Sequence, residues 1–421
     1  MVKRRISLVH PTSNPNSRNA AIALAEANLL HEIITTTAYN PKGRLAQTIQ
    51  RLPRSLGSFL SQELERRAWM APSGAILKTH PWRETLRVCL VKSGLSSKLG
   101  FGQQGLIDRV YASLDHHVAQ HHLDQLDAIY AYEDGAASTF QAAKQRGIRC
   151  FYELPIAFHY TSRKIQQDEA DRFPEFASSL QAIHEPKWKL ERKDQEVALA
   201  DHIFVPSTTT HQSLLDAGIA SERISVIPYG APVDYFKPEL KRDKQFRALF
   251  VGRVGPRKGV HYLLDAWKKL RLNDAELKLV GVDEFPPGWL QSHQDYINYQ
   301  ASVPHASLNQ YYCSANIFVF PSLVEGFGLV QLEAMACGIP VITTPNAGGL
   351  DLITDGVDGF TVPIRDSNAL QEKLEWCYRH PKEMAKMGRA ARKKAEAFTW
   401  TAYQKKLTDE IEKLFSSSRD E

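Results

Sequence analysis

Residues 316–344 read NIFVFPSLVEGFGLVQLEAMACGIPVITT. Apolar runs at 317–320 and 340–343 flank a glycine-rich turn that holds Glu325 and a helix-length segment that holds Glu333. Two short apolar runs joined by a helix predict a βαβ unit with parallel strands. The turn follows a strand, and open α/β sheets bind ligands at the carboxyl ends of their strands. We therefore expect both carboxylates to lie at a ligand site.

The composition around this stretch is that of a globular protein large enough for two domains. The chain has 421 residues, 43% of them hydrophobic, and a net charge of +5, which does not by itself indicate binding to nucleic acid. Five scattered cysteines without a C-x-x-C pair predict reduced core thiols in a cytosolic protein. The first residues lack the apolar region of a signal peptide, and no window resembles a membrane span.

Apolar runs alternate with helix-length segments along most of the chain, which predicts two doubly wound, Rossmann-like α/β domains. Residues 228–243 combine three prolines with charges and no periodicity, and they predict a linker. We therefore expect an N-terminal domain at 1–235 and a C-terminal domain at 236–398. Residues 40–125 lose the alternation and predict a basic insertion on the first domain.

A second turn, GRVGPRKG at 252–259, follows a predicted strand and opens a predicted helix. Backbone N–H groups at a helix N-terminus favour a phosphate, and Arg253, Arg257 and Lys258 add positive charge. The spacing matches neither the dinucleotide fingerprint nor the P-loop. A basic helix start on the protein surface is the alternative interpretation of this turn when it is taken alone.

The two glutamates suit hydroxyl groups of a ligand next to such a phosphate. Glu333 lies in an otherwise apolar helix, and a carboxylate there can accept two hydrogen bonds from a ribose diol. Glu325 precedes the amides of 327–329 and would meet another hydroxylated group. A solvent-exposed helical glutamate is the alternative interpretation of Glu333.

These motifs together resemble a known family. The E-x7-E spacing from Glu325 to Glu333, the flanking FVFPS, GFGL and EAMACGIPVITT, and VGR…KG at 251–259 are similar to those of the retaining, nucleotide-sugar-dependent glycosyltransferases of family 4. The similarity runs from about residue 200 to 400 and includes VIPYGAPVDYFKP at 226–238 and DGVDGFTVP at 355–363. The resemblance implies the GT-B fold, in which two Rossmann-like domains face a cleft, and hexosyltransferase activity.

The resemblance also implies roles for individual residues. Arg253 and Lys258 would bind the donor diphosphate, Glu325 would contact the donor sugar, and Glu333 would hold the nucleotide ribose. The expected donor-binding residues are Gly252, Ser322, Phe327, Gly328, Leu329 and Glu333. No cofactor is implied, because the nucleotide-sugar is a substrate. The chain contains no D-x-D motif, so we expect a metal-independent reaction.

The first half resembles the family less closely. Its opening loop, PTSNPNSRN at 11–19, has no glycine, and Asn16 and Arg18 either supply side-chain donors to a ligand or belong to a turn and helix cap. Many members carry a histidine where this chain has Glu153, which we expect to be a polar group on the acceptor side and a catalytic candidate. Glu133 fits a carboxylate position of the family. His159 either reaches the same site or is a packed histidine.

Two further features carry weaker hypotheses. His116, His117, His121 and His122 form a cluster that we interpret as a polar helix face, because no third-ligand pattern for zinc accompanies it. Residues 41–100 hold 11 Lys or Arg against three Glu, mixed with apolar side chains. They indicate either peripheral contact with an anionic membrane or a solvated insertion that packs on its own domain. The apolar residues in question are Leu56, Leu60, Trp69, Ile76, Trp82 and Leu86.

The sequence therefore predicts a retaining glycosyltransferase that moves a sugar from a nucleotide-sugar to a glycan, a lipid-linked or a small-molecule acceptor. By the same resemblance, the last helix, 399–421, would pack back on the N-terminal domain. We expect a cytoplasmic location, with peripheral contact at the inner membrane surface as an option, and no nucleic-acid partner. The alternative is a non-catalytic sugar-nucleotide-binding or scaffold subunit, whereas a dehydrogenase is disfavoured by the missing G-x-G-x-x-G motif.

Overall fold

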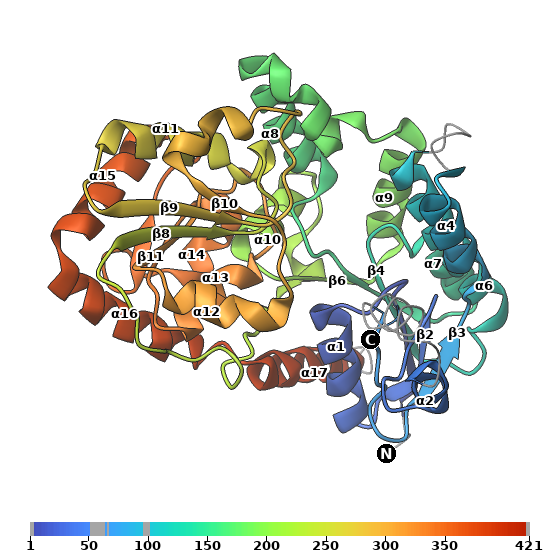
Figure 1. Cartoon of the computed structure of the whole chain (residues 1–421). Helices are drawn as coiled ribbons and strands as arrows, with labels where there is room; N and C mark the ends of the chain where they lie inside the picture. The colour runs from blue at the N-terminus through green and yellow to red at the C-terminus, as the bar shows by residue number, and fades with distance from the viewer. Residues whose placement is uncertain (1–3, 51–63, 65–66, 96–101, 418–421) are drawn as a thin grey trace. The chain divides into compact units, whose positions relative to one another are not determined.

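The computed structural model describes residues 4–50, 64, 67–95 and 102–417 of the chain (Figure 1). It divides into two compact units. Unit 1 comprises Met1–Leu154, Lys187–Phe204 and Gln404–Glu421, and unit 2 comprises Pro155–Pro186 and Val205–Tyr403. This division describes packing, and the predicted domain ranges 1–235 and 236–398 stay predictions.

The first sheet has seven strands in the order β3-β2-β1-β4-β5-β6-β7. The strand pairs from β3 to β6 are parallel, and the central strands β1 and β4 are buried along their whole length, as in a sheet covered on both faces. The strands are β1 (Ile6–Val9), β2 (Leu30–Thr35), β3 (Ile76–Thr79), β4 (Ala128–Tyr132), β5 (Arg149–Glu153), β6 (His202–Val205) and β7 (Ile224–Val226). The helices of unit 1 are α1 (Pro15–Glu26), α2 (Arg44–Gln50), α4 (Trp82–Lys92), α6 (Gln103–His121), α7 (Ala137–Gln145) and α9 (Lys187–Leu199).

The second sheet has six parallel strands in the order β10-β9-β8-β11-β12-β13. They are β8 (Phe246–Val251), β9 (Ala275–Val280), β10 (Asn298–Gln300), β11 (Ile317–Phe320), β12 (Val341–Thr343) and β13 (Gly359–Thr361). Figure 1 shows α11 on one side of β8 and β9 and α12 and α13 on the other. The helices of unit 2 are α8 (His159–Arg172), α10 (Thr208–Leu215), α11 (Val260–Leu270), α12 (Leu308–Cys313), α13 (Leu329–Ala336), α14 (Gly349–Leu352), α15 (Ser367–Arg379) and α16 (Pro381–Ala395).

These two sheets confirm the predicted α/β fold with doubly wound, Rossmann-like halves. The strand order of the second sheet changes direction at β8 and β11, so the loops after these two strands meet at one edge. The stretch 316–344 forms the predicted unit of β11, α13 and β12, with β11 and β12 parallel. The two predicted ligand-binding turns are therefore neighbours in unit 2.

The region 40–125 differs from the predicted insertion, because it contributes a strand to the sheet. β3 pairs in parallel with β2 at the sheet edge, and only one of its four side chains is even partly buried. Such an exposed edge strand carries little of the apolar pattern by which strands are detected in a sequence. Helix α8 is a second element that the sequence did not predict, because its composition is strongly polar.

The last helix, α17 (Trp400–Ser417), contributes residues from Gln404 onward to unit 1. Within that unit, the Arg149 Nη1 donates a hydrogen bond to the Leu414 carbonyl at 2.6 Å. The guanidinium of the same arginine lies 5.0 Å from the centre of the Phe415 ring. The end of the helix is thus held by β5.

The exposure of the cysteines and of the apolar side chains in the basic segment can be compared with the predictions. Four cysteines are buried as predicted, whereas Cys89 is exposed on α4. Within the described part of the chain, no helix combines the length and apolarity needed to cross a membrane. Trp69 is buried, whereas Ile76, Trp82 and Leu86 are exposed. Leu56 and Leu60 lie outside the described residues.

Candidate active site

The basic turn at 252–259 is shaped by two glycines in the left-handed region. Gly252 follows β8 with φ of 145°, and Gly259 follows a 3-10 turn, Pro256–Lys258, with φ of 65°. A Cβ on Gly259 would lie 2.1 Å from the Pro321 carbonyl oxygen, so only glycine fits. This close approach packs the basic turn against the loop after β11, which carries Glu325.

Lys258 and Glu325 meet where the two turns touch. The Lys258 ammonium forms an ion pair with the Glu325 carboxylate and lies 4.8 Å from the centre of the Phe320 ring. Only 8% of the Lys258 side chain is exposed. Burial is the main cause that lowers the pKa of Lys258, and the charge of Arg257 acts in the same direction. A further negative charge at this position would therefore stabilise the ammonium form.

A second cation, Arg257, lies near Glu325, whereas Arg253, which we expect to bind the diphosphate, has another partner. Arg257 Nη1 lies 3.7 Å from Glu325 Oε2 and donates a hydrogen bond to the Val324 carbonyl at 3.0 Å. Arg253 forms an ion pair with Glu284, and 59% of its side chain is exposed. The sequence places three cations in this segment, and two of them, Arg257 and Lys258, lie in the 3-10 turn. The spacing of the residues alone does not show which of the three side chains points toward Glu325.

The N-terminus of α13 adds backbone donors beside this pair. Gly328 precedes the helix with φ of 69°, and no side chain caps the first turn. Gly326 is equally constrained, because a Cβ there would lie 1.7 Å from the Pro155 carbonyl oxygen. The predicted residues Phe327, Gly328 and Leu329 thus form the start of a helix whose N–H groups carry partial positive charge.

Glu333 is buried on α13 and not exposed to solvent as the alternative interpretation required. Its Oε2 accepts a hydrogen bond from the Tyr312 hydroxyl at 2.8 Å, and its Oε1 lies 2.8 Å from His305 Nε2. Burial, followed by the Glu333 charge, raises the pKa of Tyr312 well above its ordinary value. A carboxylate has about four acceptor sites, so these two partners leave capacity for ligand hydroxyls.

Ser322 is fully buried in the loop after β11. Its hydroxyl donates to the Val324 carbonyl at 3.2 Å, and its own carbonyl accepts a hydrogen bond from Thr344 Oγ1 at 2.6 Å. A hydroxyl has one proton to donate, and here that proton serves the turn. We therefore expect Ser322 to hold the shape of the loop rather than to touch a ligand.

In unit 1, of the two carboxylates that were assigned to the acceptor side, Glu153 is buried and Glu133 is partly buried. Glu153 ends β5, and its Oε2 accepts a hydrogen bond from the Tyr130 hydroxyl at 2.6 Å. Glu133 lies 3.5 Å from the Lys193 ammonium, and 12% of its side chain is exposed. Both carboxylates have protein partners, as charges that are withdrawn from water require.

The loop after β1 was expected either to supply side-chain donors to a ligand or to form a turn and helix cap. Asn14 caps α1 and forms a capping box with Ser17, which is the helix-cap interpretation of this segment. Asn16 and Arg18 follow inside the helix; Arg18 is exposed, and the Asn16 Oδ1 is buried without a partner among the described residues. Asn16 thus keeps an acceptor that the cap does not use.

His159 is a packed group, whereas the histidine cluster has exposed members, His116 and His121, on α6. His159 is buried at the start of α8, in unit 2, with its ring 4.4 Å from that of Phe158. His117 stacks on His80, which the sequence had not placed in the cluster, at 4.1 Å. No group of three or more ligand side chains that could hold a metal occurs among the described residues. The metal-independent reaction stays a prediction.

Comparison with known sequences bears on unit 2. Residues 234–394 match the family model described as glycosyl transferases group 1. D-inositol 3-phosphate glycosyltransferase of Streptosporangium roseum is 29% identical over 251 residues, which cover 53% of this chain and 58% of the relative. The capsular polysaccharide biosynthesis glycosyltransferase CapM of Staphylococcus aureus is 28% identical over 218 residues, which cover 47% of this chain and 57% of the relative. The chain spans a little over half the length of these curated relatives.

Comparison with solved structures covers nearly the whole chain. Sucrose-phosphate synthase from Thermosynechococcus elongatus aligns with a TM-score of 0.65 and 20% identity, over 98% of this chain and 100% of that chain. HepE of Anabaena in complex with UDP aligns with a TM-score of 0.63 and 16% identity, over 97% of this chain and 100% of that chain. At these identities the likeness concerns the fold, and the predicted GT-B fold is confirmed.

Proposed function

We propose that the chain is a retaining glycosyltransferase of family 4, of the hexosyltransferase type, that uses a nucleotide-sugar donor. The observation that carries the proposal is the buried ion pair of Lys258 with Glu325 next to the uncapped N-terminus of α13. The match of residues 234–394 to group 1 glycosyl transferases supports it. The E-x7-E motif supplies both carboxylates of the donor site.

The site suits the departure of a diphosphate. Glycosyl transfer develops positive charge on the anomeric carbon and negative charge on the leaving phosphate. Lys258 and the N–H groups of 327–329 stabilise that negative charge without a metal, and Arg253 can turn from Glu284 toward the phosphate because most of its side chain is exposed. Glu325 accepts hydrogen bonds from hydroxyl groups of the sugar, and Glu333 accepts hydrogen bonds from the ribose hydroxyls.

Retention follows if the acceptor approaches on the face from which the diphosphate departs. The leaving phosphate then takes the acceptor's proton, and no separate general base is needed. Glu153 fits a supporting polar role, since its carboxylate already accepts the Tyr130 hydroxyl. The acceptor is a glycan, a lipid-linked sugar or a small molecule.

A thermal-shift screen against UDP, GDP, ADP and their sugars tests the donor assignment. UDP is the first candidate, because HepE was solved with it. We expect one nucleotide to raise the melting temperature equally in EDTA and in magnesium. The absence of a shift with every nucleotide would remove the proposal.

The Glu333→Gln variant tests the ribose contact. We expect the dissociation constant of the preferred nucleoside diphosphate to rise about tenfold, as for the loss of a hydrogen bond to a charged group. The 2′,3′-dideoxy analogue has no diol, so its weaker binding should change little. Titration calorimetry measures both ligands, and an equal loss for the two would show that Glu333 acts through the fold instead.

The non-catalytic alternative makes a different prediction for the same protein. A scaffold subunit would bind the nucleotide without releasing it from its sugar. The intact charged residues Lys258, Glu325 and Glu333 argue against a degenerate site, because such a site no longer needs to stabilise a leaving group. Acceptor-independent release of nucleoside diphosphate distinguishes the two.

A cytoplasmic location with peripheral contact to an anionic membrane is also proposed. The supporting feature is a set of exposed apolar side chains near exposed cations such as Arg83, whose guanidinium lies 4.0 Å from the centre of the Trp82 ring. Basic amphipathic surfaces of this kind bind anionic lipid. The exposed apolar residues are Met70, Ile76, Trp82, Leu86 and Leu95.

Liposome flotation tests this contact. We expect the protein to float with vesicles that contain anionic lipid and not with neutral vesicles, because the attraction is electrostatic. Trp82→Ala should weaken flotation, whereas Trp188→Ala, a matched exposed tryptophan on α9, should not. Equal binding to both vesicle types, or to neither, would refute the contact.

A further inference from the structure

A cavity of about 380 Å³ in unit 1 is not accounted for by the donor site. Thr12 and Ser13 line it from the loop after β1, and Thr36 and Thr37 line it from the loop after β2. The rest of its wall comes from Arg67 and one side of α4. The cavity therefore lies at the carboxyl ends of two parallel strands, where open α/β sheets bind ligands.

The charged side chains that line this cavity carry a surplus of positive charge. Arg67, Arg87 and Lys92 stand against a single carboxylate, Glu84, which leaves a surplus of two positive charges among the residues of the lining. Side-chain exposure is 18% for Arg67 and 22% for Arg87, so both guanidinium groups are largely desolvated. Positive charge that is withdrawn from water favours an anionic partner.

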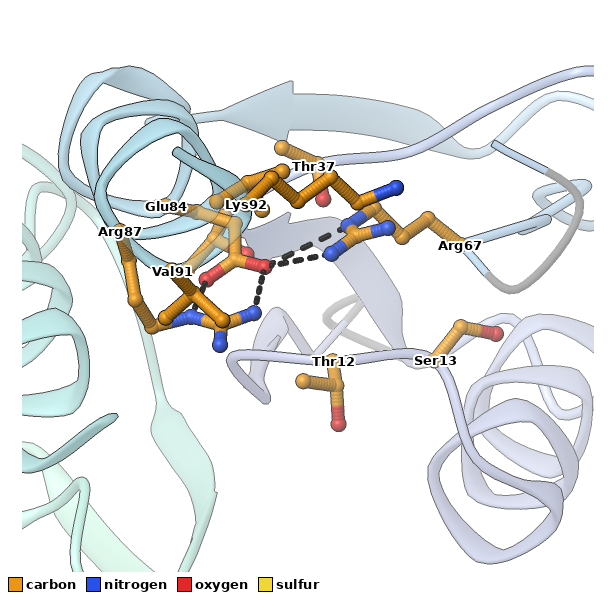
Figure 2. Close-up of a pocket in the computed structure, with 10 residues that line it drawn as sticks. Thr12, Ser13, Thr37, Arg67, Glu84, Arg87, Val91 and Lys92 are labelled. Carbon is orange, nitrogen blue, oxygen red and sulfur yellow. Dashed lines mark hydrogen bonds and ion pairs between the residues drawn. The ribbon is translucent and has the colours of Figure 1, made fainter. Parts of the chain in front are cut away.

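Glu84 holds the two arginines in fixed positions. Arg67 donates to Glu84 Oε1 from Nη2 at 3.0 Å and from Nε at 3.3 Å. Arg87 donates to Oε1 from Nη2 and to Oε2 from Nε, both at 2.7 Å. Burial raises the pKa of Glu84, but the bonds from the two arginines outweigh it and keep the pKa below its ordinary value. Figure 2 shows the carboxylate between the two guanidinium groups, with Thr12 across the cavity.

We propose that this cavity binds a phosphate group of the sugar acceptor, an assignment that rests on the glycosyltransferase function proposed above. A phosphate monoester carries about −1.5 to −2 charges at pH 7, which matches the surplus on the lining. Arginine forks and hydroxyl donors are the groups that recognise phosphate oxygens. The acceptor is thus a phosphorylated compound, either a free phosphate ester or a lipid phosphate.

The ion pairs around Glu84 also fasten α4 to the unit, and a purely structural role for them predicts no ligand. Lys92 distinguishes a ligand-binding role of the cavity from a purely structural one, because it is exposed at the end of α4 and lines the cavity. Lys78 on β3 is equally exposed but does not line it. Lys92→Gln and Lys78→Gln are therefore a matched pair of substitutions in one unit.

Titration calorimetry with inorganic phosphate as the probe tests the proposal. We expect wild-type protein to bind phosphate, Lys92→Gln to raise the dissociation constant about three- to tenfold, and Lys78→Gln to leave it unchanged. Arg87→Gln should weaken phosphate binding about tenfold or more. If the Arg87→Gln protein does not fold, Lys92→Gln alone tests the proposal. No binding by wild-type protein, or the same effect of both lysine substitutions, would overturn the proposal.

Vesicles that contain phosphatidic acid distinguish the two sources of phosphate. Inorganic phosphate should compete with these vesicles if the acceptor is a lipid, and should bind without competition from them if the acceptor is a free ester. Acceptor-independent release of nucleoside diphosphate is measured on the same wild-type protein. If the protein releases nucleoside diphosphate but does not bind phosphate, only this inference is refuted. If it binds phosphate but releases no nucleoside diphosphate, the proposed transferase function is refuted.

Discussion

Replacing Lys258 with methionine is expected to lower turnover by about 10²–10³-fold, the usual effect of removing one donor that stabilises a developing negative charge. The Lys258 ammonium is buried, so a leaving diphosphate would meet it with little screening by water. Methionine keeps much of the side-chain volume and removes the charge. The binding of nucleoside diphosphate should weaken as well, because the ammonium would contact the phosphate both before and after transfer.

Lys269→Met is the matched control for this substitution. Lys269 lies on α11, which begins directly after the basic turn, and its exposed side chain pairs with Asp265 at 2.7 Å. An exposed pair of this kind contributes little, so turnover should stay within about twofold of wild type. Near-wild-type turnover of Lys258→Met in a folded protein would contradict the assignment of Lys258.

Glu325→Gln is expected to lower turnover by about 10²-fold with a different binding signature. The Glu325 carboxylate would accept hydroxyl hydrogen bonds from the sugar, so the nucleotide-sugar should bind more weakly. The nucleoside diphosphate has no sugar at that position, and its affinity should change much less. Calorimetry with both ligands, together with steady-state kinetics, separates this role from that of Lys258.

The control for Glu325→Gln is Glu276→Gln, which also removes a carboxylate from an ion pair in unit 2. Glu276 pairs with Arg247 near the amino end of β9, at the edge of the sheet opposite the site. Its loss should lower the melting temperature and leave the Michaelis constant unchanged. If Glu325→Gln weakens the nucleoside diphosphate as much as the nucleotide-sugar, Glu325 acts only by holding Lys258.

The sequence predicted unit 2 well because its signals are local. The strand Ile317–Phe320 is a continuous buried apolar run, and the glycines of GFGL mark positions where a side chain would collide with the backbone or with neighbouring side chains. The spacing of Glu325 and Glu333 then separates a turn residue from a helix residue. The expectation that Lys258 and Glu325 share a site came from the family resemblance, since Glu325 lies 67 positions after Lys258 in the chain.

Unit 1 was predicted less completely because its features depend on pairing over long distances. β3 is an exposed edge strand, and Arg67 reaches Glu84, 17 positions further along the chain, only in the folded unit. The basic segment appeared in the sequence as a diffuse excess of charge. Folding brings three of its eleven cations to one cavity. The local pattern of the sequence does not show which three these are.

The most direct test of the account is the release of nucleoside diphosphate from a panel of nucleotide-sugars, measured without acceptor for wild-type protein and Lys258→Met. The account predicts slow release from one donor by the wild type and a loss of about 10²-fold or more in the variant. No release from any donor, or equal release by the two proteins, would contradict it.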